Sequence, residues 1–281
     1  MIDVSAYLAR IGYSGPTTPN AETLRALHRA HMLAVPFENL DIALGRRIVV
    51  DQDVCMRKVV ELRRGGFCYE LNGAFAALLE ALGFRVTLLS ARVAREKGGE
   101  GPEFDHLTLR VDLDKPWLAD VGFGDSFLEP LALEAETEQL DPAGRFRLAQ
   151  LPAIDEDRLQ LERAGKPPAG RPPALAGGSR SEPDGSWKPQ YSFSLQPRQI
   201  TDFAGMCHYH QTSPQSSFTQ KSTCSLATPE GRITLSGMKL ITTRNGAREE
   251  RELASEQERK AVLQELFGIN LGLAELRANS Q

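Results

Sequence analysis

The sequence lacks the features that mark several classes of protein. Its 281 residues carry 33 Lys and Arg against 37 Asp and Glu, and this absence of a basic surplus argues against a nucleic-acid-binding protein. No stretch approaches 18 apolar residues without a charge, so we expect no membrane-spanning helix. The chain does not begin with a basic leader followed by an apolar run, so we expect no secretion signal.

Cysteine is also scarce. The four cysteines are too few for a disulfide framework, which favours a reducing, cytoplasmic compartment. The rest of the composition is ordinary, with 41% apolar and 25% charged residues, and it excludes a fibrous repeat or global disorder. At roughly 100–200 residues per domain, the length predicts two or three domains.

The first 90 residues have helical patterning. Asn20 is typical of an N-cap for a helix that runs to about residue 32, and Asp51 of an N-cap for a second helix. A third helix is predicted over residues 68–82, because its apolar side chains form one stripe and Gly83 is suited to end it.

From residue 84 onward the apolar period changes to two, which predicts an antiparallel sheet or small barrel. Residues 165–189 hold six prolines and five glycines, and strands are predicted on both sides, so we interpret this segment as a long hairpin loop rather than an interdomain linker. The end of the chain mixes two strands with a closing helix. The predicted strands are 85–88, 106–111, 117–121, 145–148, 158–161, 190–195, 224–226 and 232–235, and the closing helix is 255–266.

Residues 63–73 carry the strongest indication of chemistry. Gly65 and Gly66 lead directly into the third predicted helix, whose first turn contains Cys68. The free N–H groups and partial positive charge of a helix N-terminus stabilise a thiolate and lower the pKa of a cysteine placed there. The position is typical of a nucleophile, although a buried structural cysteine fits it as well.

A nucleophilic cysteine needs a base, and His106 is the candidate. It begins one predicted strand, and Asp120 ends the next. If these strands are neighbours, Asp120 can hold the imidazole tautomer while the other ring nitrogen faces Cys68. Turn initiation before a glycine-rich segment is the alternative role for Asp120.

The remaining histidines fit a catalytic role less well. His28 and His31 lie on the first predicted helix and are interpreted as helix-face residues. His208 and His210, with Cys224 nearby, suggest a metal site, but their spacing matches no standard zinc pattern. We therefore expect no metal.

Five segments resemble motifs of the arylamine N-acetyltransferase family. The nucleophile motif RGGFCYELN and the upstream motif PFENL are the most specific, and all five segments follow the family's order. In chain order they are 36–40, 64–72, 106–107, 120–124, and 212–214 with Phe218.

The resemblance implies an α+β fold in three segments. An N-terminal helical bundle over residues 1–84 would carry the nucleophile, and a central antiparallel β-barrel over 85–197 would carry the histidine and the aspartate. An α/β lid would follow over 198–281. Together they would build a cysteine-protease-like Cys-His-Asp core.

The resemblance also implies an activity. The family transfers an acetyl group from acetyl-CoA, its cosubstrate, to arylamines, hydrazines and N-hydroxyarylamines by a ping-pong reaction through an acetyl-cysteine. The triad would be Cys68, His106 and Asp120. The partners would be acetyl-CoA and small aromatic amines or hydrazines, with no nucleic acid or membrane, in a monomer or homodimer.

Supporting residues are implied in the same way. Glu38 and Arg64 would form an ion pair that braces the helix start, where the alternative is two independent surface charges. Gly122 and Gly124 would admit the coenzyme. His208 stands where the family more often has asparagine. An aromatic substrate pocket, for which ordinary core packing is the alternative, would comprise Phe37, Tyr69, Phe123 and Phe203.

Two other functions stay open at this point. Amide synthases that close macrocyclic antibiotics share this fold and triad, and take their acyl group from a carrier protein. A non-catalytic protein that binds coenzyme or aromatic compounds is the alternative from another class. The flanking motifs fit transglutaminase-like and papain-like hydrolases poorly.

Overall fold

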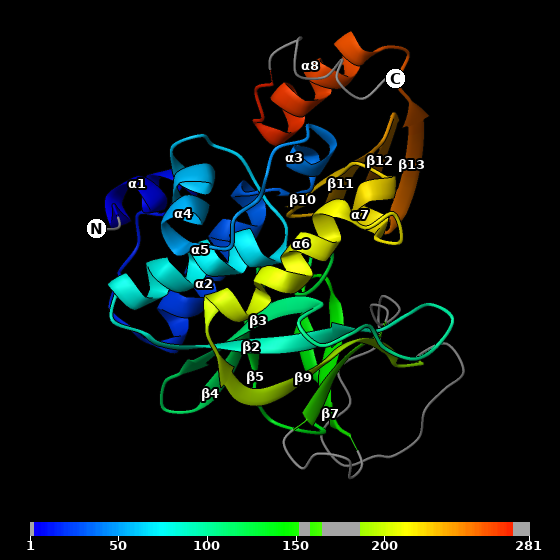
Figure 1. Ribbon diagram of the computed structural model, residues 1–281. Coiled ribbons are helices and arrows are strands. Elements are labelled where there is room, and N and C mark those ends of the chain that lie inside the picture. Colours follow the sequence, from blue (N-terminus) through cyan, green and yellow to red (C-terminus); the bar gives the residue numbers. More distant parts are fainter. Residues whose placement is uncertain (1–2, 152–157, 165–185, 272–281) are drawn as a thin grey trace.

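The computed structural model describes residues 3–151, 158–164 and 186–271, and these residues form an α+β fold (Figure 1). Helices dominate the first third, an eight-stranded antiparallel sheet follows, and a second sheet of five strands lies near the C-terminus. Residues 165–185 of the predicted loop lie outside the described residues. Within the described ranges, no helix is long and apolar enough to cross a bilayer.

The predicted helices of the first third are confirmed, and their caps explain where they begin. The side chain of Asn20 accepts the Thr23 N–H and that of Asp51 accepts the Val54 N–H, each satisfying a donor that the helix leaves free. A short first helix and a single turn after residue 39 were not expected. The helices are α1 (Val4–Arg10), α2 (Ala21–Ala34), α3 (Leu40–Ala43), α4 (Gln52–Val60) and α5 (Cys68–Ala81).

Helix α5 is the centre of the molecule. Twelve of its fourteen residues are buried, because α1, α2 and α4 cover it on one side and the β2–β3 region on the other. Gly83 has a φ of +89°, a conformation that suits glycine and ends the helix as predicted. The nucleophile candidate therefore stands at the N-terminus of a fully supported helix.

The central sheet is a nearly closed antiparallel barrel with the order β5-β4-β3-β2-β9-β8-β7-β6. A bridge between Ala135 and Leu148 links the chain after β5 to β7. Apolar side chains such as Phe146, Leu161 and Phe193 fill the interior. The strands are β2 (Arg85–Val93), β3 (His106–Asp112), β4 (Pro116–Ala119), β5 (Leu131–Ala132), β6 (Gln139–Asp141), β7 (Gly144–Gln150), β8 (Arg158–Ala164) and β9 (Lys188–Arg198).

Two predicted boundaries in the barrel are wrong. Strand β4 ends at Ala119 rather than at residue 121, because Asp120 turns inward to accept hydrogen bonds instead of continuing the ladder. Strand β9 begins at Lys188, so the proline-rich segment is shorter than 165–189. The antiparallel pairing of β8 with β9 confirms that this segment connects two partners of one hairpin.

The C-terminal part packs a second core around a five-stranded sheet of order β1-β10-β11-β12-β13. Strand β1 (Phe37–Glu38) comes from the first third and pairs with β10, so this sheet joins distant parts of the chain. Strands β1, β12 and β13 of this sheet were not predicted, nor were the short strands β5 and β6 of the barrel. The other elements are η1 (Ile200–Phe203), α6 (Ala204–Thr212), α7 (Ser217–Gln220), β10 (Thr223–Thr228), β11 (Gly231–Ser236), β12 (Lys239–Arg244), β13 (Ala247–Glu252) and α8 (Glu256–Phe267).

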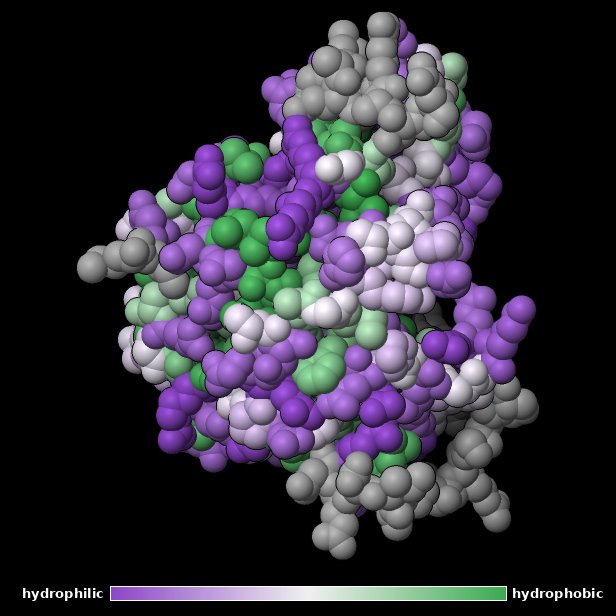
Figure 2. Space-filling model, in the orientation of Figure 1, coloured by the Kyte–Doolittle hydropathy of each residue, from purple (hydrophilic) through white to green (hydrophobic). Residues whose placement is uncertain are grey.

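The surface is mostly hydrophilic, and hydrophobic residues gather on one face over the N-terminal helices (Figure 2). Val49, Val54 and Leu62 are the exposed large apolar side chains of that third. The predicted division of the chain into segments at residues 84 and 197 stays a prediction. Strand β1 lies before residue 84 but pairs with β10, which lies after residue 197.

Candidate active site

The approach to α5 requires glycine at two successive positions. A Cβ on Gly65 would overlap the Pro36 carbonyl oxygen, and one on Gly66 would lie 2.7 Å from the Glu70 carboxylate. The close approach lets Glu38 donate its N–H to the Gly66 carbonyl at 2.8 Å. The segments 36–40 and 64–72 therefore form one packed unit at the helix start.

Cys68 is the first residue of α5 and is buried. The Leu107 N–H, one residue after His106, hydrogen-bonds the thiol and favours its ionised form. Burial is nevertheless the larger effect and raises the pKa of Cys68 well above its usual value. The sequence-based expectation of a lowered pKa is therefore wrong for the thiol, because desolvation, followed by the charges of Asp120 and Asp105, raises the pKa more than the Leu107 N–H lowers it.

His106 and Asp120 lie side by side, as their spacing predicted. Nε2 of His106 is 2.7 Å from Oδ2 of Asp120, and both side chains are buried. Because a carboxylate only accepts hydrogen bonds, Nε2 carries the proton in the neutral ring and Nδ1 is left as the free base. Pairing of β3 with β4 brings the two residues together.

Four donors converge on the Asp120 carboxylate. Oδ2 accepts from His106 and from the Tyr191 hydroxyl at 2.8 Å, and Oδ1 accepts from the Asn72 amide at 2.9 Å and the Gly122 N–H at 3.0 Å. Burial acts to raise the pKa of Asp120, but His106 and these hydrogen bonds outweigh it and hold the pKa below its usual value. Asp120 is therefore held as a carboxylate.

Three residues of this network were not singled out from the sequence. Asn72, one turn after Cys68, also donates to the Leu107 carbonyl at 2.6 Å and accepts the Val121 N–H at 2.9 Å, so it ties α5 to the segments that carry His106 and Asp120. In the sequence, Asn72 is marked only by its place at the end of the RGGFCYELN motif. Tyr191 gave no such signal.

His28 is the third of these residues, and its interpretation as a simple helix-face residue was incomplete. It is buried, donates from Nδ1 to the Leu128 carbonyl and accepts the Asp120 N–H at Nε2. Burial lowers the pKa of His28 to about 4, so the ring stays neutral and holds the backbone of Asp120 without adding charge.

The four predicted pocket aromatics fall into two groups. The Phe123 ring packs edge-on against His106 at 5.2 Å, and Phe37 packs against Phe218 at 6.2 Å. Tyr69 and Phe203 instead contact each other at 5.7 Å and are fully buried. Phe123 thus borders His106 and Phe37 borders Phe218, whereas Tyr69 and Phe203 are packed in the core.

The two glycines predicted to admit coenzyme also have a structural reason to be glycine. Gly124 has a φ of +92° and lies against the Phe37 ring. A Cβ on Gly122 would lie 2.7 Å from both Cys68 Cα and Asn72 Nδ2. Gly122 therefore sets how closely the aspartate loop approaches the nucleophile.

Changing Gly122 to alanine should push this loop away from Cys68. We expect acetyl transfer to fall more than about tenfold and the free energy of unfolding to fall by about 1–3 kcal/mol. Gly205→Ala is the matched control, because a Cβ there meets no heavy atom within 4 Å. Steady-state kinetics and urea unfolding of both variants test this, and a Gly122→Ala enzyme with wild-type activity would contradict it.

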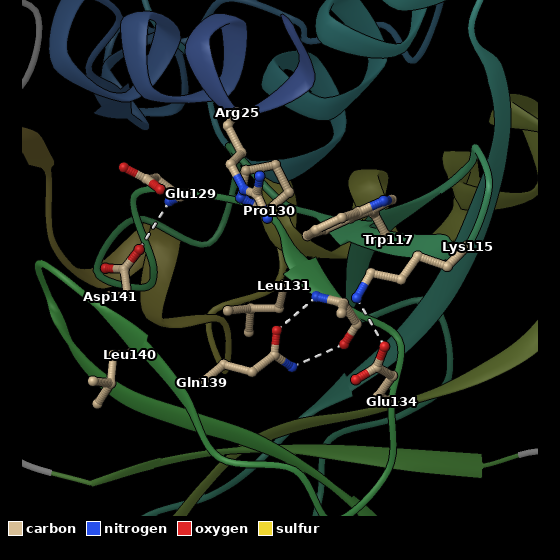
Figure 3. Close-up of a pocket in the computed structure, with 11 residues that line it drawn as sticks. Arg25, Lys115, Trp117, Glu129, Pro130, Leu131, Glu134, Gln139, Leu140 and Asp141 are labelled. Carbon is tan, nitrogen blue, oxygen red and sulfur yellow. Dashed lines mark hydrogen bonds and ion pairs between the residues drawn. The ribbon is translucent and has the colours of Figure 1, made fainter. Parts of the chain in front are cut away.

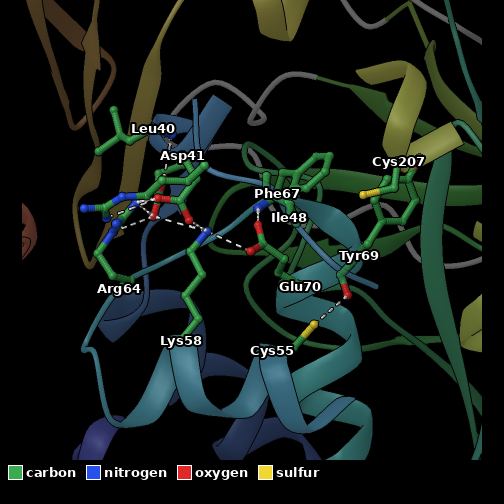
Figure 4. A network of polar contacts seen from close by, with 12 residues as sticks. Leu40, Asp41, Ile48, Cys55, Lys58, Arg64, Phe67, Tyr69, Glu70 and Cys207 are labelled. Carbon is green, nitrogen blue, oxygen red and sulfur yellow. Dashed lines mark hydrogen bonds and ion pairs between the residues drawn. The ribbon is translucent and has the colours of Figure 1, made fainter. Parts of the chain in front are cut away.

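The predicted pair of Glu38 and Arg64 is part of a larger buried ion network (Figure 4). Arg64 lies 2.7 Å from Glu38 and 3.0 Å from Asp41, and Lys58 lies 2.7 Å from both Asp41 and Glu70. Glu70 also accepts the Phe67 N–H at 3.2 Å, which caps α5 one residue before Cys68. Charge pairing therefore braces the first turn of the nucleophile helix.

The protonation of Glu70 in this network has a pH-dependent consequence for stability. Burial raises the pKa of Glu70 to about 7, despite the opposing charge of Lys58. This pKa lies above the ordinary value of 4.5. The stabilisation that Glu70 gives the folded state is therefore complete below the pKa that Glu70 has in the unfolded chain, and it is lost as pH rises through about 7.

We therefore expect wild type to lose up to about 3 kcal/mol of unfolding free energy relative to Glu70→Gln between about pH 5 and pH 8. Urea unfolding across that range measures the difference. Glu80→Gln, an exposed change on the same helix, serves as control. A difference between wild type and Glu70→Gln that does not vary with pH would refute the assignment.

A surface cleft of about 550 Å³ lies elsewhere, between α2 and strands β4 to β6 (Figure 3). Arg25 and Lys115 flank the Trp117 ring there, at 4.6 and 5.1 Å from its centroid. None of Cys68, His106 and Asp120 lines this cleft. In the part of the chain that the structure describes, no group of three or more His, Cys, Asp or Glu residues is arranged to hold a metal ion.

Comparisons with known proteins agree with this geometry. A family model described as N-acetyltransferase matches residues 20–276. The arylamine N-acetyltransferase of Escherichia coli is 35% identical over 94% of this chain and 88% of its own. The solved Salmonella typhimurium arylamine N-acetyltransferase superposes with a TM-score of 0.85 at 31% identity, over 98% of this chain and 97% of its own. The Mycobacterium marinum enzyme, solved in complex with CoA, gives a TM-score of 0.84 at 30% identity, over 99% and 98% of the two chains. The chain therefore belongs to the arylamine N-acetyltransferase family.

Proposed function

We propose that this protein transfers the acetyl group of acetyl-CoA to arylamines, hydrazines and N-hydroxyarylamines through an acetyl-Cys68 intermediate. The hydrogen-bonded pair of His106 and Asp120 beside the nucleophile helix carries the proposal. The CoA complex of the M. marinum relative supports the donor, and the similarity to arylamine N-acetyltransferases supports the arylamine acceptor.

The first half-reaction starts from a thiol that does not ionise on its own. Because burial raises the pKa of Cys68, the thiolate forms only as its proton passes to Nδ1 of His106, and the Asp120 carboxylate stabilises the resulting imidazolium. The sulfur then attacks the thioester carbonyl carbon. The carbon–sulfur bond to coenzyme A breaks, and the departing thiolate takes the proton from His106.

The second half-reaction reverses these roles. The amine nitrogen attacks the carbonyl carbon of acetyl-Cys68, and His106 accepts the proton that the nitrogen loses. The bond between the carbonyl carbon and the Cys68 sulfur breaks, and His106 returns the proton to that sulfur. The free N–H groups at the start of α5 are placed to stabilise the oxyanion in both steps.

The neighbouring side chains have supporting roles in this scheme. Phe37 and Phe123 would form the wall against which an aromatic acceptor packs, with Tyr69 and Phe203 behind it. Gly122 and Gly124 would admit the pantetheine arm. The buried free thiols require a reducing compartment, so cytoplasmic placement is part of the proposal.

Acid-quenched mass spectrometry after adding acetyl-CoA without amine tests the proposal directly. We expect an acetyl adduct on the peptide containing Cys68, which disappears when an aniline is added and CoA has been removed. An enzyme that turns over acetyl-CoA and aniline without ever forming this adduct would sink the ping-pong mechanism. Failure to turn over simple anilines would instead favour the amide synthase alternative, which takes its acyl group from a carrier protein.

A further inference from the structure

The segment that leads into His106 is held in a strained conformation. Phe104, two residues earlier, has a φ of +64°, which is uncommon for a residue other than glycine and costs about 1–3 kcal/mol for a bulky one. Such a conformation persists only where its surroundings fix it. The contacts of residues 104 and 105 therefore affect the position of His106.

Contacts from four directions fix the turn at residues 104 and 105. The Tyr69 hydroxyl donates to the Phe104 carbonyl at 2.7 Å, and the Phe104 N–H donates to the Ser90 hydroxyl at 2.8 Å. The Phe104 ring packs edge-on against Phe203 at 5.3 Å and lies 5.1 Å from the Arg198 guanidinium. Tyr69 directly follows Cys68, so one of these contacts already links the turn to the nucleophile.

A further contact comes from α6. His210 on α6 is buried, and its Nε2 lies 3.2 Å from Oδ1 of Asp105, the residue before His106, within ion-pair distance but outside hydrogen-bond geometry. Its Nδ1 is 3.3 Å from the Ser216 hydroxyl, and its ring packs on Phe218 at 5.1 Å. The titratable groups around the ring are Asp105 and the hydroxyls of Tyr69 and Tyr209.

We propose that His210, through Asp105, is a positioning residue that holds the 104–105 turn and thereby keeps His106 in place beside Cys68. It touches neither substrate nor the reacting sulfur. The contact makes α6 a part of the active-site framework, so the C-terminal third controls the geometry of a triad that the first two thirds supply. This role rests on the proposed function, because it assumes that His106 is the base.

The test combines His210→Phe, which keeps an aromatic ring but removes both nitrogens, with Asp105→Asn, which removes the charge. We expect each to slow acetylation of Cys68 by acetyl-CoA about tenfold, and the double variant to be no slower than the worse single variant. His208→Phe makes the same change two residues away on the exposed side of α6 and should leave the rate unchanged.

Alkylation of Cys68 by iodoacetamide, followed across pH, gives a second measurement that needs no acetyl-CoA. We expect its pH profile to shift to higher pH in His210→Phe and Asp105→Asn but not in His208→Phe, because a displaced His106 no longer assists ionisation of the thiol. Loss of the Asp105 charge alone would shift the profile to lower pH, because that charge raises the pKa of Cys68. A purely structural role would lower the unfolding temperature and leave this profile unchanged, which would overturn the proposal. Should His210→Phe fail to fold, Asp105→Asn alone decides.

The two measurements separate this proposal from the proposed function. If His210→Phe and Asp105→Asn show the wild-type alkylation profile while wild type is acetylated normally, only the positioning role is refuted. A wild-type enzyme that forms no acetyl adduct, but whose alkylation profile still depends on His210, would refute acetyl transfer and leave the positioning role standing.

Discussion

Replacing Cys68 by alanine is expected to abolish acetyl transfer, with a loss of at least about four orders of magnitude in kcat/KM. In the proposed reaction the sulfur carries the acetyl group between donor and acceptor, and no other described cysteine stands at a helix N-terminus beside the histidine and aspartate pair. Release of free CoA thiol in the presence of an aniline measures the activity.

Cys224→Ala provides the matched control for this variant. Cys224 is likewise a buried, unpaired cysteine, but it packs in the second core beneath the five-stranded sheet. We expect that variant to keep wild-type activity, and both variants to unfold within about 1–2 kcal/mol of wild type. Acetyl transfer by Cys68→Ala above about one hundredth of the wild-type rate would rule out the acetyl-cysteine.

The elements that the sequence predicted best are those with a local cause. Asn20 and Asp51 cap their helices with their own side chains, and Gly83 ends α5 through its own φ. Strand β13, over residues 247–252, was missed because it is exposed throughout and therefore has no apolar alternation to detect.

The residues of the candidate site likewise fall into those that a local sequence pattern marks and those that only the fold brings together. Cys68, His106 and Asp120 were found because each stands at the beginning or end of a predicted element, and the pairing of β3 with β4 then brings the last two together. Tyr191 reaches Asp120 from 71 residues away, across the barrel. Such a contact depends on the closed sheet and leaves no pattern in the sequence.

The motif segments near residues 36–40 and 212–218 acquire a physical reason only in the fold. Asn39 donates its amide to the Phe218 carbonyl at 3.0 Å and to the Lys221 carbonyl at 2.9 Å, and accepts the Thr223 N–H. The upstream motif therefore anchors the C-terminal third beside the nucleophile helix, where α6 supplies His210. For Cys68, the position at a helix N-terminus predicted a lowered pKa, whereas burial raises the pKa of the thiol.

Asp120→Asn should reduce acetyl transfer by about four orders of magnitude, even though the two side chains have the same shape. All four groups that contact the carboxylate are donors, so an amide must turn its NH₂ toward two of them in either orientation. If the NH₂ faces His106, the ring must accept at Nε2 and carry its proton on Nδ1. In the proposed reaction Nδ1 is the atom that takes the thiol proton, and a nitrogen that already carries a proton cannot do so.

Tyr191→Phe separates this tautomer effect from the loss of a single hydrogen bond. It removes one donor to Asp120 but leaves the carboxylate to hold Nε2–H of His106, so we expect a loss of only about tenfold. The rate of Cys68 acetylation in acid-quenched samples compares the two variants at the affected step. If Asp120→Asn and Tyr191→Phe lose activity equally, Asp120 acts only as one member of a structural network, whereas a difference of about a thousandfold assigns it control of the proton on His106.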